Sequence, residues 1–167
     1  MEHEGRDDQN KKSSALNYAL WLLGRRSRTK FELEKKLREK GVEDAEIKSA
    51  IRRLEELQFI DDLKFARDYI SNSARFKPKG RRRLFWELVK KGVAKDLIEK
   101  ALDETESDQT ALADEALKTY SRRLKNLSRE KQYQRAVAFL LRRGFSYDEA
   151  KKAVQLLLQG SNPCRPL

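Results

Sequence analysis

The sequence predicts an all-α protein built from three tandem three-helix repeats of the helix-turn-helix kind. A stretch of apolar residues followed by a basic residue and a glycine occurs three times, with glycines at Gly41, Gly92 and Gly144, about 50 residues apart. A tyrosine recurs in nearly the same register, and no alternating run of β-branched residues occurs. The chain therefore repeats one helical unit and lacks the pattern of a sheet.

The composition favours stacked repeats over a single globule. Charged residues make up 39% of the 167 residues and the mean hydropathy is −0.87, so the core must be thin and the surface large. A unit of about 50 residues is only marginally stable alone. Because stacking buries the apolar faces of neighbouring units, we expect an elongated array.

Changes in composition divide the chain into five segments. A polar, aperiodic start predicts a disordered tail, and prolines with polar residues predict a second tail at the end. The segments are the N-terminal tail 1–13, repeat 1 at 14–60, repeat 2 at 61–105, repeat 3 at 106–160 and the C-terminal tail 161–167. The acidic stretch 103–115 is expected to link repeats 2 and 3.

In repeat 1, apolar residues at helical spacing predict a first helix over Ala15–Leu23, packed into the unit. Thr29 and Glu32 have the spacing of a capping box, which predicts a second helix that runs to Lys40. The glycine that follows ends this helix, since glycine adopts the left-handed conformation without a steric cost. An apolar stripe over Ile47–Leu57 predicts the third helix.

Repeat 2 opens with two adjacent carboxylates, Asp61 and Asp62, which follow Phe59 and Ile60. Either aspartate is predicted to cap the helix that follows. Paired carboxylates also suit a metal site, but no further Asp, Glu or His stands at ligand spacing, and we favour capping. Pro78 marks a break before the next helix.

The central helix, over Gly80–Val93, is predicted to have two different faces. At about 100° per residue, apolar side chains fall on one side and polar or basic side chains on the other. The apolar face holds Leu84, Phe85, Leu88 and Val89. The opposite face holds Arg83, Trp86 and Lys90.

Trp86 has two competing interpretations. The equivalent positions in repeats 1 and 3 are Lys35 and Ala138, so the fold does not require an aromatic residue there. Trp86 is either an exposed contact residue beside two cations or a residue that packs against a neighbouring repeat, as large aromatic residues usually do. The recurring Tyr18, Tyr69 and Tyr120 are expected to be core residues.

In repeat 3, helices are predicted over Leu112–Leu124, Ser128–Arg143 and Ser146–Leu158. Ser146 and Glu149 form a second capping box at the start of the last helix.

The net charge of +11 and a pI near 9.8 indicate an anionic partner. Nucleic acid and an acidic protein surface fit better than a membrane, because no apolar run approaches the ~20 residues of a spanning helix. The start of the chain lacks the apolar segment of a secretory signal. Cys164 is the single cysteine, which excludes an intrachain disulfide and favours the cytoplasm.

Residues for enzymatic chemistry are almost absent. His3, the single histidine, falls in the expected tail, and there is no phosphate-binding glycine loop and no paired-cysteine metal motif. We expect no catalytic residue, no metal and no cofactor. A two-metal nuclease built from scattered carboxylates remains an alternative, although most carboxylates alternate with Lys and Arg, as on solvated helix faces.

Basic residues cluster at related places in repeats 2 and 3, and stacking would align them into a basic stripe. We expect this stripe, with Trp86, to form the binding surface; the alternative is a basic surface that only confers solubility. The predicted contact residues are Lys77, Lys79, Arg81, Arg82, Arg83, Trp86, Lys90, Arg122, Arg123, Lys125, Arg129, Lys131, Arg142 and Arg143.

Over residues 15 to 158 the chain resembles the RecX family of recombination regulators. The order and spacing of several short motifs carry the resemblance. They are Leu37, Lys40 and Gly41; Phe59-Ile60-Asp61-Asp62 with Phe65-Ala66; Gly80, Glu87-Leu88 and Lys91-Gly92-Val93; and Leu141-Arg142-Arg143-Gly144-Phe145. Gln58 departs from the pattern, since the family commonly has glycine there.

The resemblance implies a curved, elongated monomer that binds the RecA recombinase filament on single-stranded DNA. It also implies inhibition of filament growth, ATP hydrolysis, strand exchange and coprotease activity. The matched motifs look structural, so the contact residues come from the charge pattern and not from the family. The alternative function is a helical-repeat protein that binds nucleic acid directly, without a recombinase.

Overall fold

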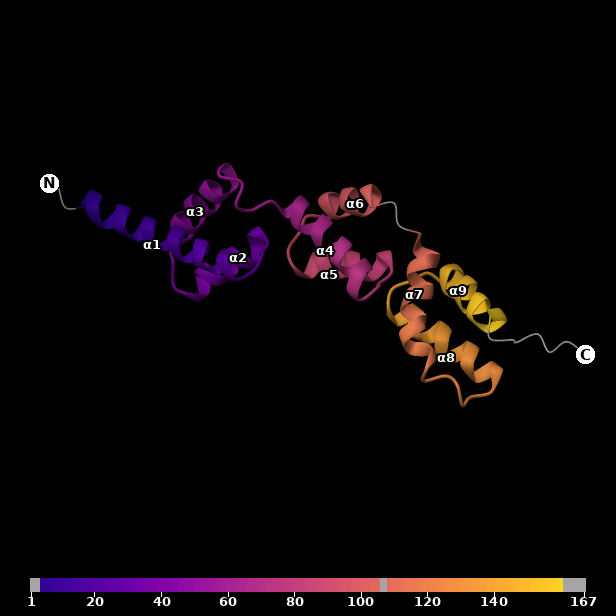
Figure 1. Cartoon of the computed structure of the whole chain (residues 1–167). Coiled ribbons are helices and arrows are strands. Elements are labelled where there is room, and N and C mark those ends of the chain that lie inside the picture. Colours follow the sequence, from indigo (N-terminus) through magenta and orange to yellow (C-terminus); the bar gives the residue numbers. More distant parts are fainter. Residues whose placement is uncertain (1–3, 106–107, 161–167) are drawn as a thin grey trace, which may run out of the picture. The chain divides into compact units, whose positions relative to one another are not determined.

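The computed structural model describes residues 4–105 and 108–160, and within them the chain forms nine α-helices and no strand (Figure 1). The helices are α1 (Glu4–Arg25), α2 (Lys30–Glu39), α3 (Asp44–Glu56), α4 (Asp62–Phe76), α5 (Arg81–Lys90), α6 (Lys95–Glu104), α7 (Gln109–Ser121), α8 (Arg129–Arg142) and α9 (Tyr147–Gly160). The predicted all-α class is confirmed, and each group of three helices corresponds to one predicted repeat.

The first helix begins earlier than expected. Residues from Glu4 onward belong to α1, so the prediction of a disordered tail over 1–13 is wrong for residues 4–13. Residues 1–3, with His3, and the predicted C-terminal tail, with Cys164, lie outside the described residues.

The described residues divide into two compact units. Unit 1 contains the chain up to Ala66 together with Leu88–Ile98, and unit 2 contains Arg67–Glu87 together with the chain from Glu99 onward. Within unit 1, α1, α2 and α3 share one core in which Leu22, Leu33 and Leu54 are buried. Burial of each such leucine contributes about 1.5–3 kcal/mol.

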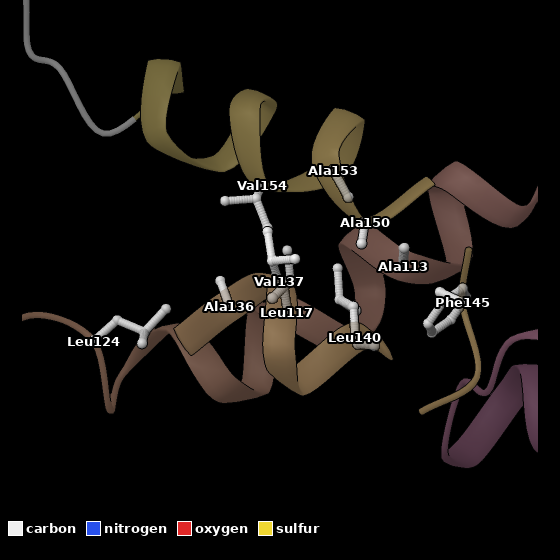
Figure 2. Close-up of a cluster of buried hydrophobic side chains, with 11 residues drawn as sticks. Ala113, Leu117, Leu124, Ala136, Val137, Leu140, Phe145, Ala150, Ala153 and Val154 are labelled. Carbon is white, nitrogen blue, oxygen red and sulfur yellow. The ribbon is translucent and has the colours of Figure 1, made fainter. Parts of the chain in front are cut away.

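The core of α7, α8 and α9 lies in unit 2. Figure 2 shows Leu117 of α7, Val137 and Leu140 of α8 and Val154 of α9 converging between the three helices. Small side chains let the backbones approach closely, and these are Ala113, Ala116, Ala136, Ala150 and Ala153. The apolar residues lie at the 3.6-residue spacing from which these helices were predicted.

The three repeated glycines end α2, α5 and α8 in the same way. Gly41, Gly92 and Gly144 have φ values of 81°, 80° and 88°, in the left-handed region that favours glycine. In each case the residue after the glycine donates a backbone hydrogen bond to the carbonyl five positions earlier, at 3.1 to 3.2 Å. This is the Schellman arrangement, and it confirms glycine as the stop signal of each helix.

Side chains cap the helix starts as predicted at two capping boxes. The Thr29 hydroxyl accepts the Glu32 backbone N–H at 3.1 Å. At the start of α9 the box is reciprocal: the Ser146 hydroxyl accepts the Glu149 N–H at 3.3 Å, and the Glu149 carboxylate accepts the Ser146 N–H at 2.7 Å. Both boxes satisfy donors that a helix start leaves unpaired.

The adjacent carboxylates of repeat 2 cap two different helices. Asp61 accepts the Lys64 N–H at 2.9 Å and so caps α4, whereas Asp62 accepts the Lys30 N–H at 3.0 Å at the start of α2. The capping interpretation is therefore confirmed, with Asp62 acting on a helix far away in sequence. Burial raises the pKa of Asp62, although the Lys30 N–H opposes that effect.

Candidate nucleic-acid and filament interface

Helix α5 has the two faces that its sequence predicts. Leu84 and Leu88 are buried, whereas Arg83 and Lys90 are exposed. Trp86 is 53% exposed and meets Phe85 edge-on at 5.5 Å between ring centroids. The structure therefore places Trp86 on the surface of α5, and its role as a contact residue stays a prediction.

A polar network at the start of α5 engages two of the predicted contact residues. The Glu87 carboxylate accepts hydrogen bonds from Lys79 at 2.5 Å, from Arg83 at 2.9 Å and from the Tyr69 hydroxyl at 2.8 Å. The Arg83 guanidinium also donates to the Arg142 carbonyl at 3.1 Å. Lys79 and Arg83, both predicted contact residues, thus also have partners within unit 2.

This network shifts two pKa values. Burial on its own would raise the pKa of Glu87, but hydrogen bonds from Lys79, Arg83 and Tyr69 outweigh it and lower the value to about 2. Burial and the neighbouring Glu87 carboxylate raise the pKa of Tyr69 to about 12. The carboxylate is thus ionised, and the phenol is protonated, throughout the physiological range.

A close crossing of two glycines brings the start of α5 against the end of α8. The Gly80 N–H donates to the Arg143 carbonyl at 3.0 Å, and the Arg143 guanidinium donates to the Pro78 carbonyl at 3.1 Å. A Cβ on Gly80 would overlap the backbone of Gly144, and a Cβ on Gly144 would overlap Arg83. Only glycine fits at this crossing without movement of the neighbouring backbone.

Arg143 and Arg81 also serve structure. Burial and the nearby Arg83 charge lower the pKa of Arg143, whose guanidinium lies 4.9 Å from the centroid of the Phe139 ring. Arg81 forms an ion pair with Asp103 at 2.6 Å. Both arginines, like Lys79 and Arg83, therefore have partners within unit 2, and all four remain predicted contact residues.

The other predicted cations are exposed, as is Trp86. These cations are Lys77, Arg82, Lys90, Arg122, Arg123, Lys125, Arg129, Lys131 and Arg142. Arg82 lines a cavity of about 850 Å³ beside Phe85, Leu141 and Tyr147, where Glu99, Asp103 and Glu149 also contribute negative charge. This mixed charge makes the cavity a poor anion site, so the outward helix faces are the better candidates.

A basic stripe runs along the exposed face of α8. Lys131, Arg135 and Arg142 are exposed and lie within about 40° of one another around the helix. Within the described residues none of the three side chains forms an ion pair. We call these three residues the α8 stripe.

Sequence reasoning placed Arg135 in a basic cluster but did not select it as a contact residue. Aligning the cap glycines of α5 and α8 would have found it, because the outward face of α5 then recurs on α8. Arg135 takes the place of Arg83, and Arg142 takes the place of Lys90. The aromatic position becomes Ala138.

A second group of cations lies at the other end of α8. Arg122, Arg123 and Lys125 occupy the turn between α7 and α8, and Arg129 begins α8. At 1.5 Å per residue, the span from Arg129 to Arg142 is about 20 Å. The α8 stripe thus extends from beside this second group to the C-terminal end of α8.

Residues 4–105 and 108–160 hold neither a candidate metal-binding group nor a candidate membrane-spanning helix. That part of the chain contains no group of three or more His, Cys, Asp or Glu side chains suited to hold a metal ion. Nor does it contain a helix whose length and apolar content would let it span a membrane.

Comparison with known proteins gives a consistent match. Models described as the first, second and third three-helix domains of RecX match residues 15–54, 61–102 and 106–154. Regulatory protein RecX of Chlorobaculum tepidum is 38% identical over 151 residues, which cover 90% of this chain and 92% of the relative. The RecX of Vibrio parahaemolyticus is 36% identical over 141 residues, which cover 84% and 90%. The crystal structure of RecX from Lactobacillus salivarius superposes with a TM-score of 0.79 at 26% identity and covers 90% of this chain and 99% of that chain.

Proposed function

Because the chain belongs to the RecX family of regulatory proteins, we propose that it is a negative regulator of the RecA recombinase. In this proposal it binds the RecA filament on single-stranded DNA, as a monomer in the cytoplasm. Binding inhibits filament growth, ATP hydrolysis, strand exchange and coprotease activity. Regulation of this kind needs a binding surface and no catalytic residue.

The observation that carries the proposal is the α8 stripe, supported by Trp86 and Lys90 on α5. Exposed cations spaced along a helix attract phosphates or acidic side chains, and the affinity falls as salt rises. An exposed tryptophan adds apolar contact area, and such residues often dominate protein interfaces. A filament of protein on DNA offers both acidic side chains and phosphates.

The test is DNA-dependent ATP hydrolysis by the cognate RecA. Substoichiometric amounts of the folded chain should reduce the steady-state rate, because one bound regulator blocks growth of a whole filament end or segment. Circular dichroism verifies folding of each sample beforehand. An unchanged rate with excess folded protein contradicts the proposal.

Direct binding to nucleic acid is the second candidate function, and Trp86 favours it. A base stacked on an exposed aromatic side chain contributes about 1–3 kcal/mol, and the nearby cations would hold the backbone. Fluorescence anisotropy of an oligo(dT) strand, without recombinase and at two salt concentrations, separates the candidates. Tight, steeply salt-dependent binding with no effect on RecA favours direct binding.

A further inference from the structure

The helix cap at Lys91 and Gly92 receives the start of another helix. Within unit 1, the Thr29 hydroxyl at the N-cap of α2 donates to the Lys91 carbonyl at 2.6 Å. The Lys91 ammonium pairs with Glu32, in the first turn of α2, at 2.9 Å. The Phe31 side chain lies directly over the position that a Cβ on Gly92 would occupy.

The cap at Gly144 receives a helix start in the same way within unit 2. There the Gly80 N–H donates to the Arg143 carbonyl, and Arg83 covers the glycine. In both cases an N-cap donor bonds the carbonyl just before the cap glycine, and a side chain from the first turn covers that glycine. This chain therefore uses its glycine caps as receptors for helix N-termini.

The third cap, at Lys40 and Gly41, has the same backbone geometry but no occupant among the described residues. No heavy atom lies within 4 Å of the position that a Cβ on Gly41 would occupy, whereas the other two cap glycines are covered. Within residues 4–105 and 108–160, no group donates to the Lys40 carbonyl and no carboxylate pairs with its ammonium. The Lys40–Gly41 cap therefore has the backbone geometry of the other two caps, and its surface is open to solvent.

A partly exposed aromatic stack adjoins this open cap. The Lys40 ammonium lies 3.8 Å from the centroid of the Tyr18 ring, and Tyr18 stacks on Trp21 at 5.7 Å. The Arg25 guanidinium lies 4.2 Å from the centroid of the Trp21 ring. Trp21 is 51% exposed. Large exposed aromatic side chains flanked by cations are typical of protein interaction sites.

We propose that the Lys40–Gly41 cap, with Trp21, binds the N-terminus of a helix in a protein partner. The partner helix is expected to have a hydroxyl-bearing or glycine N-cap that donates to the Lys40 carbonyl. An acidic residue in its first turn pairs with Lys40, as Glu32 pairs with Lys91. The identification of this partner as the recombinase rests on the proposed function. The chemistry of the contact is independent of the proposed function.

Charge argues against the start of α8 in a second copy as the occupant. The start of α8 is available in a second copy, because the Ser128 side chain makes no cap hydrogen bond. However, Arg129 and Lys131 flank its one acidic residue, Glu130, and the preceding turn adds three more cations. Because Lys40 and Arg25 are also cationic, this helix start would be repelled, whereas an acidic helix N-terminus is attracted.

Trp21 itself reports binding once Trp86 is replaced by phenylalanine, since the chain has two tryptophans. The probe is a short stapled peptide helix that begins Thr-Ala-Phe-Glu, after residues 29–32, and otherwise consists of alanine and glutamate. It should change the Trp21 emission saturably, and Lys40→Glu should weaken binding at least about tenfold, because it breaks a charge-assisted pair. Lys48→Glu on α3 is the matched control, since Lys48 is exposed and the charge change is the same.

Three results would overturn the proposal. One is an unchanged Trp21 emission with the peptide. Another is equal affinity for a peptide in which valine and lysine replace its threonine and glutamate. The third is a concentration-dependent mass of the chain alone that Lys40→Glu abolishes, since this would make a second copy the occupant.

Binding to the cognate RecA filament then separates this proposal from the proposed function. Weaker filament binding by Lys40→Glu but not by Lys48→Glu supports the recombinase as the partner at this cap. Equal filament binding by both variants overturns that assignment and leaves the proposed function intact. A wild-type chain that does not bind the filament overturns the proposed function, and the peptide result alone then decides whether the cap is a helix receptor.

Discussion

Gln58 adopts a backbone conformation that suits glycine. Its φ of 57° lies in the left-handed region, just after the end of α3. The conformation costs a residue with a Cβ about 1–2 kcal/mol, while glycine loses about 0.4–1 kcal/mol more through unfolded-chain entropy. We therefore predict that Gln58→Gly stabilises the chain by about 0.5–1 kcal/mol in urea denaturation. Gln58→Ala retains the strain and is the control; alanine at least as stable as glycine would contradict the prediction.

Glu87 should make the stability of unit 2 depend on acid pH. Its pKa falls from an ordinary 4.5 to about 2 in the folded state, so the unfolded chain takes up this proton first as the pH drops. The stabilisation is therefore complete above about pH 5 and is lost between about pH 5 and pH 2. After allowance for solvent screening, we expect the loss to be on the order of 1 kcal/mol.

The measurement is the unfolding free energy of the wild type and of Glu87→Gln across this pH range. The variant lacks the titrating carboxylate, so its curve should fall less steeply between pH 5 and pH 2. Parallel curves would show that Glu87 does not carry this part of the acid sensitivity.

Gly144 and Gly41 share a φ value near 80–90° but differ in their surroundings, which gives a matched pair of substitutions. Alanine at Gly41 incurs only the left-handed penalty of about 1–2 kcal/mol, because nothing lies near its Cβ position. Alanine at Gly144 adds an overlap with Arg83, which typically costs a further 1–3 kcal/mol or so. Thermal denaturation should therefore rank Gly144→Ala clearly below Gly41→Ala, and equal midpoints would count against the close crossing.

At the scale of a helix, the α8 stripe is the cleanest test of the binding surface. Replacing Lys131, Arg135 and Arg142 by alanine removes three exposed cations and leaves the buried face of α8 unchanged. Filament affinity should fall, and the salt dependence should flatten by about 0.7 in slope for each single-strand phosphate that the variant no longer neutralises. The helix should remain, since alanine has the highest helix propensity.

Lys151 and Lys152, exposed on α9, provide the control for this experiment. Replacing both by alanine lowers the net charge at positions outside the stripe. A control variant that loses as much affinity as the stripe variant would mean that net charge, and not the stripe, determines binding. Circular dichroism of both variants excludes unfolding as the cause.

The sequence predicts the helices of this fold better than it predicts the partners of the basic side chains. Cap glycines and apolar periodicity are local signals, and so the stops at Gly41, Gly92 and Gly144 were predicted correctly. The roles of Lys79, Arg83 and Arg143 depend on which backbone carbonyls and carboxylates the fold brings near them. Charge patterns along a sequence do not contain that information, so the hydrogen-bond partners of these three side chains could not be predicted.

At the scale of the whole molecule, the exposed cations on α5 and α8 raise the question of whether one partner engages both helices. Trp86 and Lys90 present an outward face on α5, while Arg83, on the same face, is held by Glu87. The informative α5 variant is therefore Trp86→Ala with Lys90→Ala, which leaves the network around Glu87 intact. It is to be compared with the α8 stripe variant and with a variant that combines both sets.

If a single filament binds both helices, the α5 substitutions and the α8 stripe substitutions should each weaken binding by an independent contribution to the binding free energy. The decreases in affinity should then add in the combined variant to within about 0.5 kcal/mol, as is usual for distant residues without shared partners. Competition for the filament by labelled wild-type chain measures all three decreases at two salt concentrations. The effect of removing Trp86 should persist at high salt, because its contact is largely apolar, whereas the effect of removing the α8 stripe should shrink as ions screen the charges. A combined variant no weaker than the stripe variant alone would show that α5 does not contact the partner and that binding is confined to the third repeat.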